Sequence, residues 1–278
     1  MPELVFDVGM HNGSDTAYYL ARGYDVVSVE ANPALCEAAR SRFAAEIEAG
    51  RLDVRNVGVA DEAGVMEFWV SDHSEWSSFN KEHATMDGVA AHPLEVPTMP
   101  FAEILDAYRT PLYVKIDIEL NDSVCLHALE GRTERPQYVS FEGHLEARKD
   151  IEFLAGLGYQ SFKCVRQIDW LEITPGNVQG QGRARKVIAK TKGQKTVHKA
   201  LRRAHYRKAP INGYRFETGS SGPLARERTG NWMTSDEVMS VWDQLLTIDR
   251  EMNAQGLGEW FDIHAALGPV AEQKQAVS

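Results

Sequence analysis

The sequence predicts an α/β protein with a doubly wound, mostly parallel sheet and a C-terminal helical addition. Short apolar strands alternate with helical segments over residues 1–175. A glycine-containing turn follows the first strand, and an acidic residue ends the second. The composition, with 43% hydrophobic and 25% charged residues among 278, is that of a folded globular protein.

The first 175 residues supply the strands and helices of this sheet. Strands are predicted at residues 4–9, 25–30, 52–59, 65–70, 112–118 and 138–141. Helices are predicted at residues 14–20, 33–50, 122–129 and 145–157, with Ser14 and Asn32 as caps. Residues 71–100 are expected to form a long functional loop, and residues 159–165 and 170–173 an antiparallel closing pair. This alternation is typical of a Rossmann-like fold.

The composition changes after Pro175, first to Gly and Gln and then to basic residues. We therefore expect two domains, residues 1–175 and residues 176–278. Thr234 and Glu237 have the spacing of a capping box and precede a helix with a continuous apolar face. That face is expected to pack on the main domain, and a partner interface is the alternative.

Several features bear on location and on covalent cross-links. The longest apolar runs, such as residues 26–29 and 112–114, are far shorter than the roughly 20 residues of a membrane-spanning helix. The first residues lack the pattern of a secretory signal, so a cytoplasmic location is expected. Cys36, Cys125 and Cys164 are widely spaced without a CxxC pair, so neither disulfides nor structural zinc are expected.

The turn after the first strand, Asp7 to Thr16, is expected to bind a ligand at the carboxyl edge of the sheet. A dinucleotide fingerprint that starts at Gly9 requires glycines where this chain has His11 and Ser14. Nicotinamide and flavin cofactors are therefore disfavoured. Glu30 ends the second strand at the position where an acidic side chain binds both hydroxyls of a ribose. A nucleoside without phosphates fits this pattern best.

Five segments together carry a family resemblance. They are Asp7-Val8-Gly9 with Asn12-Gly13, Val29-Glu30-Ala31-Asn32-Pro33, Val57-Gly58-Val59-Ala60-Asp61 with Gly64, Trp76-Ser77-Ser78-Phe79, and Val114-Lys115-Ile116-Asp117-Ile118-Glu119. In this order and at this spacing, the chain from about Leu4 to about His144 resembles FkbM-type S-adenosylmethionine-dependent methyltransferases. The resemblance implies a methyltransferase fold and O-methylation of hydroxyls on sugars or natural products.

The resemblance also implies which residues bind S-adenosylmethionine. The expected cofactor-binding residues are Asp7, Gly9, Asn12, Gly13, Thr16, Glu30, Ala31, Asn32, Gly58, Val59, Asp61, Ser77 and Ser78. The first four surround the methionine part, Glu30 holds the ribose, and Gly58, Val59 and Asp61 lie along the adenine. Where the family has Glu-Gly-His, this chain has Glu119-Leu120-Asn121, so the family's histidine contact to the substrate is not carried over.

Methyl transfer to a hydroxyl requires alignment of the oxygen and removal of its proton. The catalytic candidates at the strand ends are Asp117, His144, Glu142 and Lys115. The structural alternatives are that His144 caps a strand end and that Asp117 caps the following helix. A magnesium or calcium site from Asp117, Glu119, Asp122, Glu142 and His144 is a further alternative, although no metal is expected.

The net charge is −10, yet twelve Lys and Arg and no acidic residue lie between Ile173 and Phe216. The segment 183–208 is expected to form one or two amphipathic helices, interrupted near Gly193. It is a solvated face, an electropositive rim for an anionic glycan or other small-molecule acceptor, or a site of contact with anionic lipid. Sparse aromatic residues disfavour nucleic acid.

Two function classes remain. One is an O-methyltransferase acting on a hydroxyl of a carbohydrate or related anionic metabolite. The other is a catalytically idle protein of the same fold that uses its basic arm as an interaction module. Methylation of nucleic acid is a lesser alternative to both.

Overall fold

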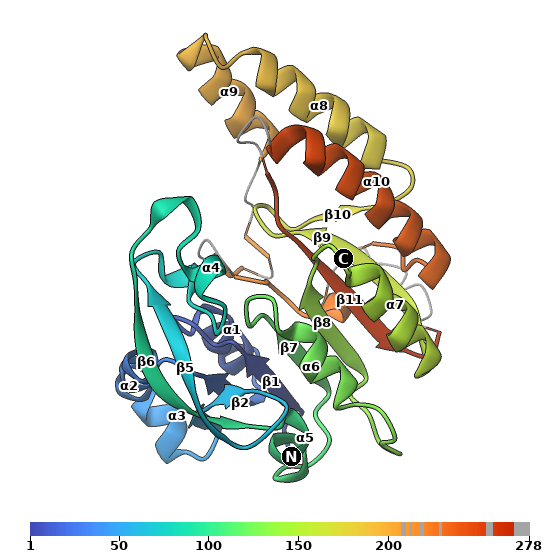
Figure 1. The fold of residues 1–278 in the computed structure, drawn as a ribbon. Coiled ribbons are helices and arrows are strands. Elements are labelled where there is room, and N and C mark those ends of the chain that lie inside the picture. The colour runs from blue at the N-terminus through green and yellow to red at the C-terminus, as the bar shows by residue number, and fades with distance from the viewer. Residues whose placement is uncertain (207–209, 212, 217–219, 228–229, 254–257, 270–278) are drawn as a thin grey trace. The chain divides into compact units, whose positions relative to one another are not determined.

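The computed structural model describes residues 1–269 except 207–209, 212, 217–219, 228–229 and 254–257. The chain forms two compact units, Met1–Glu142 and Gly143–Ser278 (Figure 1). The domain boundary expected between residues 175 and 176 stays a prediction. Arg207 and Lys208 of the basic segment lie outside the described residues.

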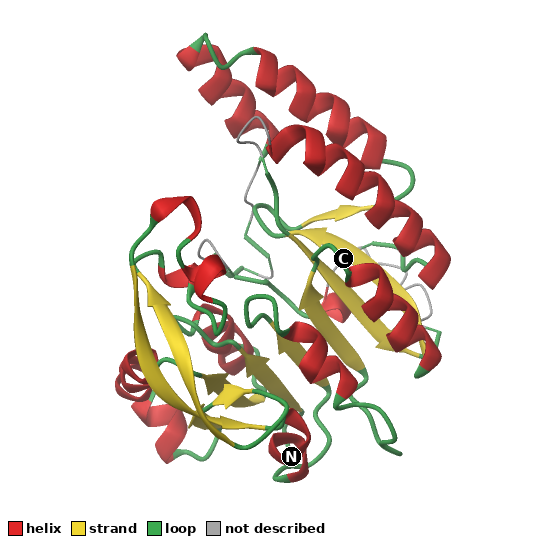
Figure 2. Ribbon diagram, viewed as in Figure 1, coloured by secondary structure: helices red, strands yellow, loops and turns green. Residues whose placement is uncertain are grey.

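Parallel strands form the central sheet of the first unit (Figure 2). They are β1 (Leu4–Val8), β2 (Asp25–Glu30), β3 (Leu52–Asn56), β7 (Tyr113–Ile116) and β8 (Tyr138–Glu142). Within this unit they are neighbours in the order β8-β7-β1-β2-β3, and every pairing among them is parallel. The expectation of an α/β fold with a mostly parallel sheet is confirmed.

Helices connect these strands. They are α1 (Ser14–Ala21), α2 (Pro33–Arg42), α3 (Ala44–Glu48), α5 (Phe101–Asp106) and α6 (Asp122–His127). The single helix predicted at residues 33–50 is wrong, because the backbone of buried Phe43, with φ −108° and ψ 28°, leaves the helical region between α2 and α3.

The predicted helix caps have mixed outcomes. Asn32 caps α2 as expected, because its side chain accepts the N–H of Ala34 at 3.0 Å. Ser14 does not cap α1, since Gly13 occupies the N-cap position with a left-handed φ of 76°. The side chain of Asn12 instead accepts the N–H of Ser14 at 3.0 Å. A polar side chain two residues earlier thus accepts a hydrogen bond at the start of the helix in place of Ser14.

A second, three-stranded sheet corrects two predictions. It contains β4 (Gly58–Val59), β5 (Gly64–Ser71) and β6 (Ala91–Met99) in the order β4-β6-β5. The strand predicted at 52–59 is divided between the two sheets as β3 and β4. The loop predicted at 71–100 contains β6, α4 (Lys81–Ala84) and two 3₁₀ turns, Ser74–Trp76 and Met86–Gly88.

Two prolines explain why β6 is not predicted from the sequence. Pro93 and Pro97 have no N–H to donate and usually exclude a strand interior. Here β4 pairs only with Thr98 and Met99, so neither proline loses a bond to β4. On its other edge β6 pairs antiparallel with β5 from Ala91 to Thr98.

The second unit contains an antiparallel sheet. Its strands β9 (Tyr159–Arg166), β10 (Leu171–Ile173) and β11 (Phe261–Leu267) have the order β10-β9-β11. The antiparallel pair predicted at 159–165 and 170–173 is confirmed. Strand β11 is absent from the prediction, which treats residues 176–278 as a helical addition.

Four helices of the second unit are α7 (Ala147–Gly156), α8 (Val178–Lys190), α9 (Lys195–His205) and α10 (Ser235–Asn253), and a 3₁₀ turn spans Ala225–Glu227. The predicted capping box is confirmed, since the Thr234 N–H donates to Glu237 Oε2 at 2.8 Å and the Glu237 N–H to Thr234 Oγ1 at 3.3 Å. Helix α10 packs on α7, α8 and β9. Helices α8 and α9 are separated around Gly193, as predicted. None of the helices that the structure describes is long and apolar enough to cross a lipid bilayer.

Candidate functional site

The turn after β1 brings backbone close to two neighbouring strands. Because β1 pairs in register with β2 and β7, Gly9, Glu30 and Asp117 leave the sheet side by side at its carboxyl edge. Gly9 has a φ of +79°, and a Cβ at this position would lie 1.8 Å from the backbone oxygen of Asp117. Only glycine fits here without moving the strand-end turn.

The far end of this turn is also fixed by glycine. Gly13 has a φ of +76°, and a Cβ there would lie 2.8 Å from the ring of Phe43. His11, with φ 50°, directs its ring Nε2 to within 3.0 Å of Ser74 Oγ. Burial lowers the pKa of His11. The turn is therefore held in one conformation from both sides.

Glu30 is held by two backbone donors. The N–H of His11 donates to Oε2 at 2.9 Å, and the N–H of Asn32 donates to Oε1 at 2.8 Å. Burial raises the pKa of this carboxyl. Each oxygen has a further lone pair, so the carboxylate can accept two more hydroxyl groups, as the ribose of a nucleoside would provide. Ala31 and Asn32 continue the same turn.

Asp7 and Thr16, both expected to surround the cofactor, are fully buried. Thr16 Oγ1 donates to Asp7 Oδ2 at 2.6 Å and lies 2.7 Å from Ser28 Oγ. These contacts tie α1 to β1 and β2. Both side chains therefore lie in the interior and hold the turn after β1 in place.

Lys115 is buried beneath the same turn. Its Nζ donates to the backbone oxygen of Gly9 at 2.6 Å and lies 3.1 Å from Asp7 Oδ1 and 3.8 Å from Asp117 Oδ2. Burial lowers the pKa of Lys115, but the charges of Asp7 and Asp117 outweigh it and raise the pKa above its usual value. A lysine that stays protonated cannot act as a base, so Lys115 is a positioning residue.

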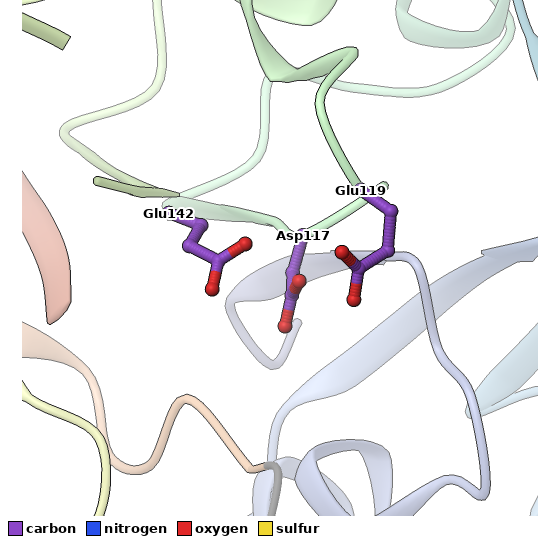
Figure 3. A group of neighbouring side chains, drawn as sticks. All are labelled: Asp117, Glu119 and Glu142. Carbon is purple, nitrogen blue, oxygen red and sulfur yellow. The ribbon is translucent and has the colours of Figure 1, made fainter. Parts of the chain in front are cut away.

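Three carboxylates gather at the ends of β7 and β8 (Figure 3). One oxygen each of Asp117, Glu119 and Glu142 lies within 4.8 Å of the other two. These three residues are called the acid cluster below. Carboxylates at this spacing suit a hard cation or the cationic part of a ligand, and they raise one another's affinity for protons.

Glu119 is the unusual member of the acid cluster. Burial raises its pKa to about 7, with a further contribution from the charge of Asp117, although a hydrogen bond to His83 opposes the shift. The Glu119 Oε2 lies 2.8 Å from His83 Nε2. Its backbone has a left-handed φ of 51° and is held by Ser78, whose Oγ donates to the Glu119 oxygen at 3.0 Å.

Asp122 has a structural role in this part of the chain. Its two oxygens accept the N–H groups of Ile118 and Glu142, both at 2.9 Å. It thus connects the turns that follow β7 and β8, and this geometry leaves the acid cluster to the other three carboxylates.

His144 lies in the second unit, at the start of α7. Its Nε2 is 2.9 Å from Asp150 Oδ2, and its Nδ1 accepts the N–H of Glu146 at 3.2 Å. Both ring nitrogens are engaged. These contacts favour the alternative in which His144 stabilises a strand end.

The segment expected to lie along the adenine is closely packed. A Cβ on Gly58 would lie 2.3 Å from the ring of Phe79, and Asn121 Nδ2 donates to the Val59 oxygen at 3.1 Å. Ser77 Oγ accepts the N–H of Ser71 at 3.1 Å. The segments that carry Val59, Ser78 and the turn at 119–121 are thereby joined.

A pocket of about 850 Å³ opens beside these segments in the first unit. Asp61 and Ser78 line it, as do Lys81, Glu119 and Asn121. Its charged lining also includes Glu62 and Glu82, so acidic residues outnumber the single lysine.

His83 and the role of Asn121 are not predictable from the sequence motifs. His83 falls in the segment predicted as loop, and it reaches Glu119 only through the tertiary fold. Asn121 stands out in the sequence only as a departure from the family pattern. The position of Asn121 two residues after Glu119 is the one feature of the sequence that could have indicated its role.

The donor set of this edge fits S-adenosylmethionine. Glu30 offers acceptors for ribose hydroxyls, the glycines admit backbone contact, and the acid cluster offers negative charge for a sulfonium. The phosphates of a dinucleotide would instead be repelled by the negative charge of the acid cluster.

Comparison with known proteins agrees with this fit. The methyltransferase FkbM domain family matches residues 7–161. No curated protein sequence matches the chain.

Similar solved structures include a methyltransferase FkbM from Methylobacillus flagellatus KT, with 13% identity and a TM-score of 0.34 over 50% of this chain and 32% of that one. Phosphoethanolamine N-methyltransferase 2 from Haemonchus contortus, in complex with S-adenosyl-L-methionine, has 12% identity and a TM-score of 0.38 over 97% and 49%. A methyltransferase from Thiobacillus denitrificans in complex with S-adenosyl-L-homocysteine has 10% identity and a TM-score of 0.34 over 96% and 85%. The chain thus spans about a third of the first of these structures and about half of the second.

The family match covers more than half of the 278 residues. The protein therefore belongs to the FkbM methyltransferase family, and its cofactor is S-adenosylmethionine.

Proposed function

We propose that the protein transfers a methyl group from S-adenosylmethionine to a hydroxyl oxygen of a carbohydrate or a related metabolite. The observation that carries this proposal is the acid cluster, which lies at the same carboxyl edge of the sheet as Gly9 and Glu30. An O-methyltransferase needs a donor site and a proton acceptor at one edge of its sheet.

The donor is held by the turn after β1 and by the ends of β2 and β3. Gly9, Asn12 and Gly13 contact the methionine part, and Glu30 accepts from the ribose hydroxyls. Ala31, Asn32, Gly58, Val59 and Asp61 flank the adenine, and Ser77 and Ser78 cover the bound cofactor. S-Adenosylmethionine supplies a methyl group that is already activated by the positive sulfonium.

The protein must then align the acceptor oxygen and take up its proton. Asp117 accepts this proton, because it lies next to the donor turn and Lys115 fixes its position. Glu142 and Glu119 add negative charge that raises the proton affinity of the cluster. The pKa of about 7 at Glu119 supports proton exchange near neutral pH. His144 is assigned a supporting role, because both of its ring nitrogens are engaged.

Charge constrains the acceptor. The acidic excess in the pocket beside Glu119 disfavours an anionic group there and favours an uncharged ring rich in hydroxyls. An acidic group elsewhere in the acceptor, such as a phosphate or a uronate, remains a proposal that rests on the twelve basic residues between Ile173 and Phe216 in the sequence. We also propose that residues 1–175 form the methyltransferase domain and that residues 176–278 form its acceptor-specific, largely helical extension.

An acceptor screen tests this function. The full chain is incubated with S-adenosylmethionine and a set of sugar nucleotides, phosphosugars, lipid-linked sugars and uronate oligosaccharides, and release of S-adenosylhomocysteine is measured. We expect methyl transfer to a hydroxyl in at least one carbohydrate class, and its loss in Asp117→Asn. Transfer only to nitrogen acceptors or to nucleic acid would overturn the assignment.

A further inference from the structure

Helix α9 has no buried residue, although its sequence is strongly amphipathic. Its exposed cations recur every three or four residues and therefore share one face; they are Lys195, Lys199, Arg202 and Arg203. Exposed aliphatic residues follow that face around the helix, with Ala200 nearest to it and Ala204 and Val197 farther round. Val197 alone is 43% exposed. An amphipathic helix of this length gains little stability in water unless another surface contacts it.

The contacts that hold α9 come from its other side. His198 Nδ1 lies 3.0 Å from the backbone oxygen of Ile188 in α8, and 3.2 Å from Thr191 Oγ1. At the other end, Arg166 Nη1 lies 3.1 Å from His205 Nε2, and the Arg166 guanidinium lies 4.9 Å from the centre of the Tyr206 ring. The helix is thus anchored along its histidine side and at Tyr206. Of its cations, Arg202 also lies near these anchors, with its guanidinium 5.7 Å from the centre of the Tyr206 ring.

Some cations of helix α8 form ion pairs with other parts of the protein, and others are exposed to solvent. Arg185 is buried and pairs with Asp249 at 2.5 Å, and Lys186 pairs with Glu251 at 2.6 Å. Arg183 and Lys190 remain exposed, with Val187 55% exposed between them. Helices α8 and α9 run side by side as a hairpin, and together they carry the surface formed by these exposed residues (Figure 1).

The cations of this surface are not neutralised by the protein. Within the described part of the chain, no carboxylate forms an ion pair with Lys190, Lys195, Lys199 or Arg203. By contrast, the cations of α7 are paired, Arg148 with Glu152 and Asp243, and Lys149 with Glu146. Lys195, Lys199 and Arg203 of α9 are therefore available to an external anion.

We propose that the α8–α9 hairpin docks on the surface of a lipid bilayer that contains anionic lipids. Basic residues beside exposed aliphatic ones are the combination that holds a helix at a charged bilayer surface. A nucleic-acid platform would need stacking aromatics, and Tyr206 is already packed against Arg166. The aliphatic strip is small, so attachment is mainly electrostatic and reversible. This inference does not rest on the proposed acceptor.

Vesicle sedimentation with the full chain tests this docking. Vesicles of phosphatidylcholine are compared with vesicles that also contain phosphatidylglycerol, from low to physiological ionic strength, where the Debye length falls from about 30 Å to about 8 Å. We expect binding only to the anionic vesicles, and weaker binding as salt rises. Lys199→Gln with Arg203→Gln should weaken binding about 25-fold, since each basic residue near an anionic surface contributes about five-fold.

A matched double variant provides the control. Arg148→Gln with Lys149→Gln also removes one arginine and one lysine from a helix of the second unit, and it should bind as the wild type does. Val197→Ser should weaken binding a few-fold. Equal loss in both double variants, equal binding to neutral vesicles, or binding to a polynucleotide but to no vesicle would overturn the proposal. The salt series on the wild-type chain decides the question even if the Lys199 and Arg203 variant does not fold.

Discussion

Removal of the Glu119 charge is predicted to stabilise the protein at high pH. Its folded-state pKa is about 7 against an ordinary value of 4.5. Below about pH 4.5 the carboxyl is protonated whether or not the chain is folded, so its ionisation costs nothing. Above about pH 7 it is ionised in both states, and the shift corresponds to about 3 kcal/mol of lost folding free energy. Glu119→Gln should therefore gain up to about 3 kcal/mol over the wild type as pH rises between these values.

The assay is urea unfolding of both proteins across this pH range. The difference between their free energies of unfolding is compared at the two ends of the range. Using the change with pH cancels any effect of the substitution that does not itself depend on pH. Glu82→Gln is the control, because Glu82 is exposed on the same helix as His83. If the stability gained by Glu119→Gln over the wild type stays constant, or falls as pH rises, the account of Glu119 is refuted.

Three further substitutions test the donor turn and the base. Gly9→Ala should destabilise the fold by several kcal/mol and abolish cofactor binding, because its Cβ would overlap the Asp117 oxygen at a φ of +79°; an unchanged melting temperature would contradict this. Lys115→Met should cost about 3–5 kcal/mol, because it leaves Asp7 buried without its cation; thermal unfolding measures it, and a loss under about 1 kcal/mol would count against the pair. Asp117→Asn should lower turnover about 10²–10⁴-fold and leave cofactor affinity within a few-fold; the reverse pattern would show that Asp117 binds the donor and does not take up the proton.

The central sheet is predictable because each strand is an apolar run bounded by turn residues. Leu4–Val8, Asp25–Glu30 and Tyr113–Ile116 are all nearly fully buried, so their composition alone identifies them. Strand β6 is not predicted because it contains two prolines. These prolines are tolerated because β4 is too short to pair with them. Strand β11 carries buried Asp262 and His264, and buried polar residues are a poor signal for a strand.

The donor edge is predictable for a related reason. Once the strand alternation is known, parallel pairing places the residues after β1, β2 and β7 together, which identifies Gly9, Glu30 and Asp117. What each side chain contacts depends on tertiary packing. The pairing of His83 with Glu119 joins residues 36 positions apart, and nothing in the sequence indicates it.

The roles of Asp122 and His144 were open for the same reason. Both stand at strand ends, where carboxylates and histidines are commonly functional. The structure shows that each accepts backbone N–H groups, and the catalytic role expected for His144 stays a prediction.

Calorimetric titration with S-adenosylmethionine tests the central claim most directly, in the wild type, Glu30→Ala and the matched control Glu37→Ala. Glu37 is exposed on α2, seven residues from Glu30. The account predicts that the wild type and Glu37→Ala bind equally and that Glu30→Ala binds at least about tenfold more weakly, because a charged acceptor for buried hydroxyls is lost. Unchanged affinity in Glu30→Ala, or a wild type that binds NAD and not S-adenosylmethionine, would contradict it.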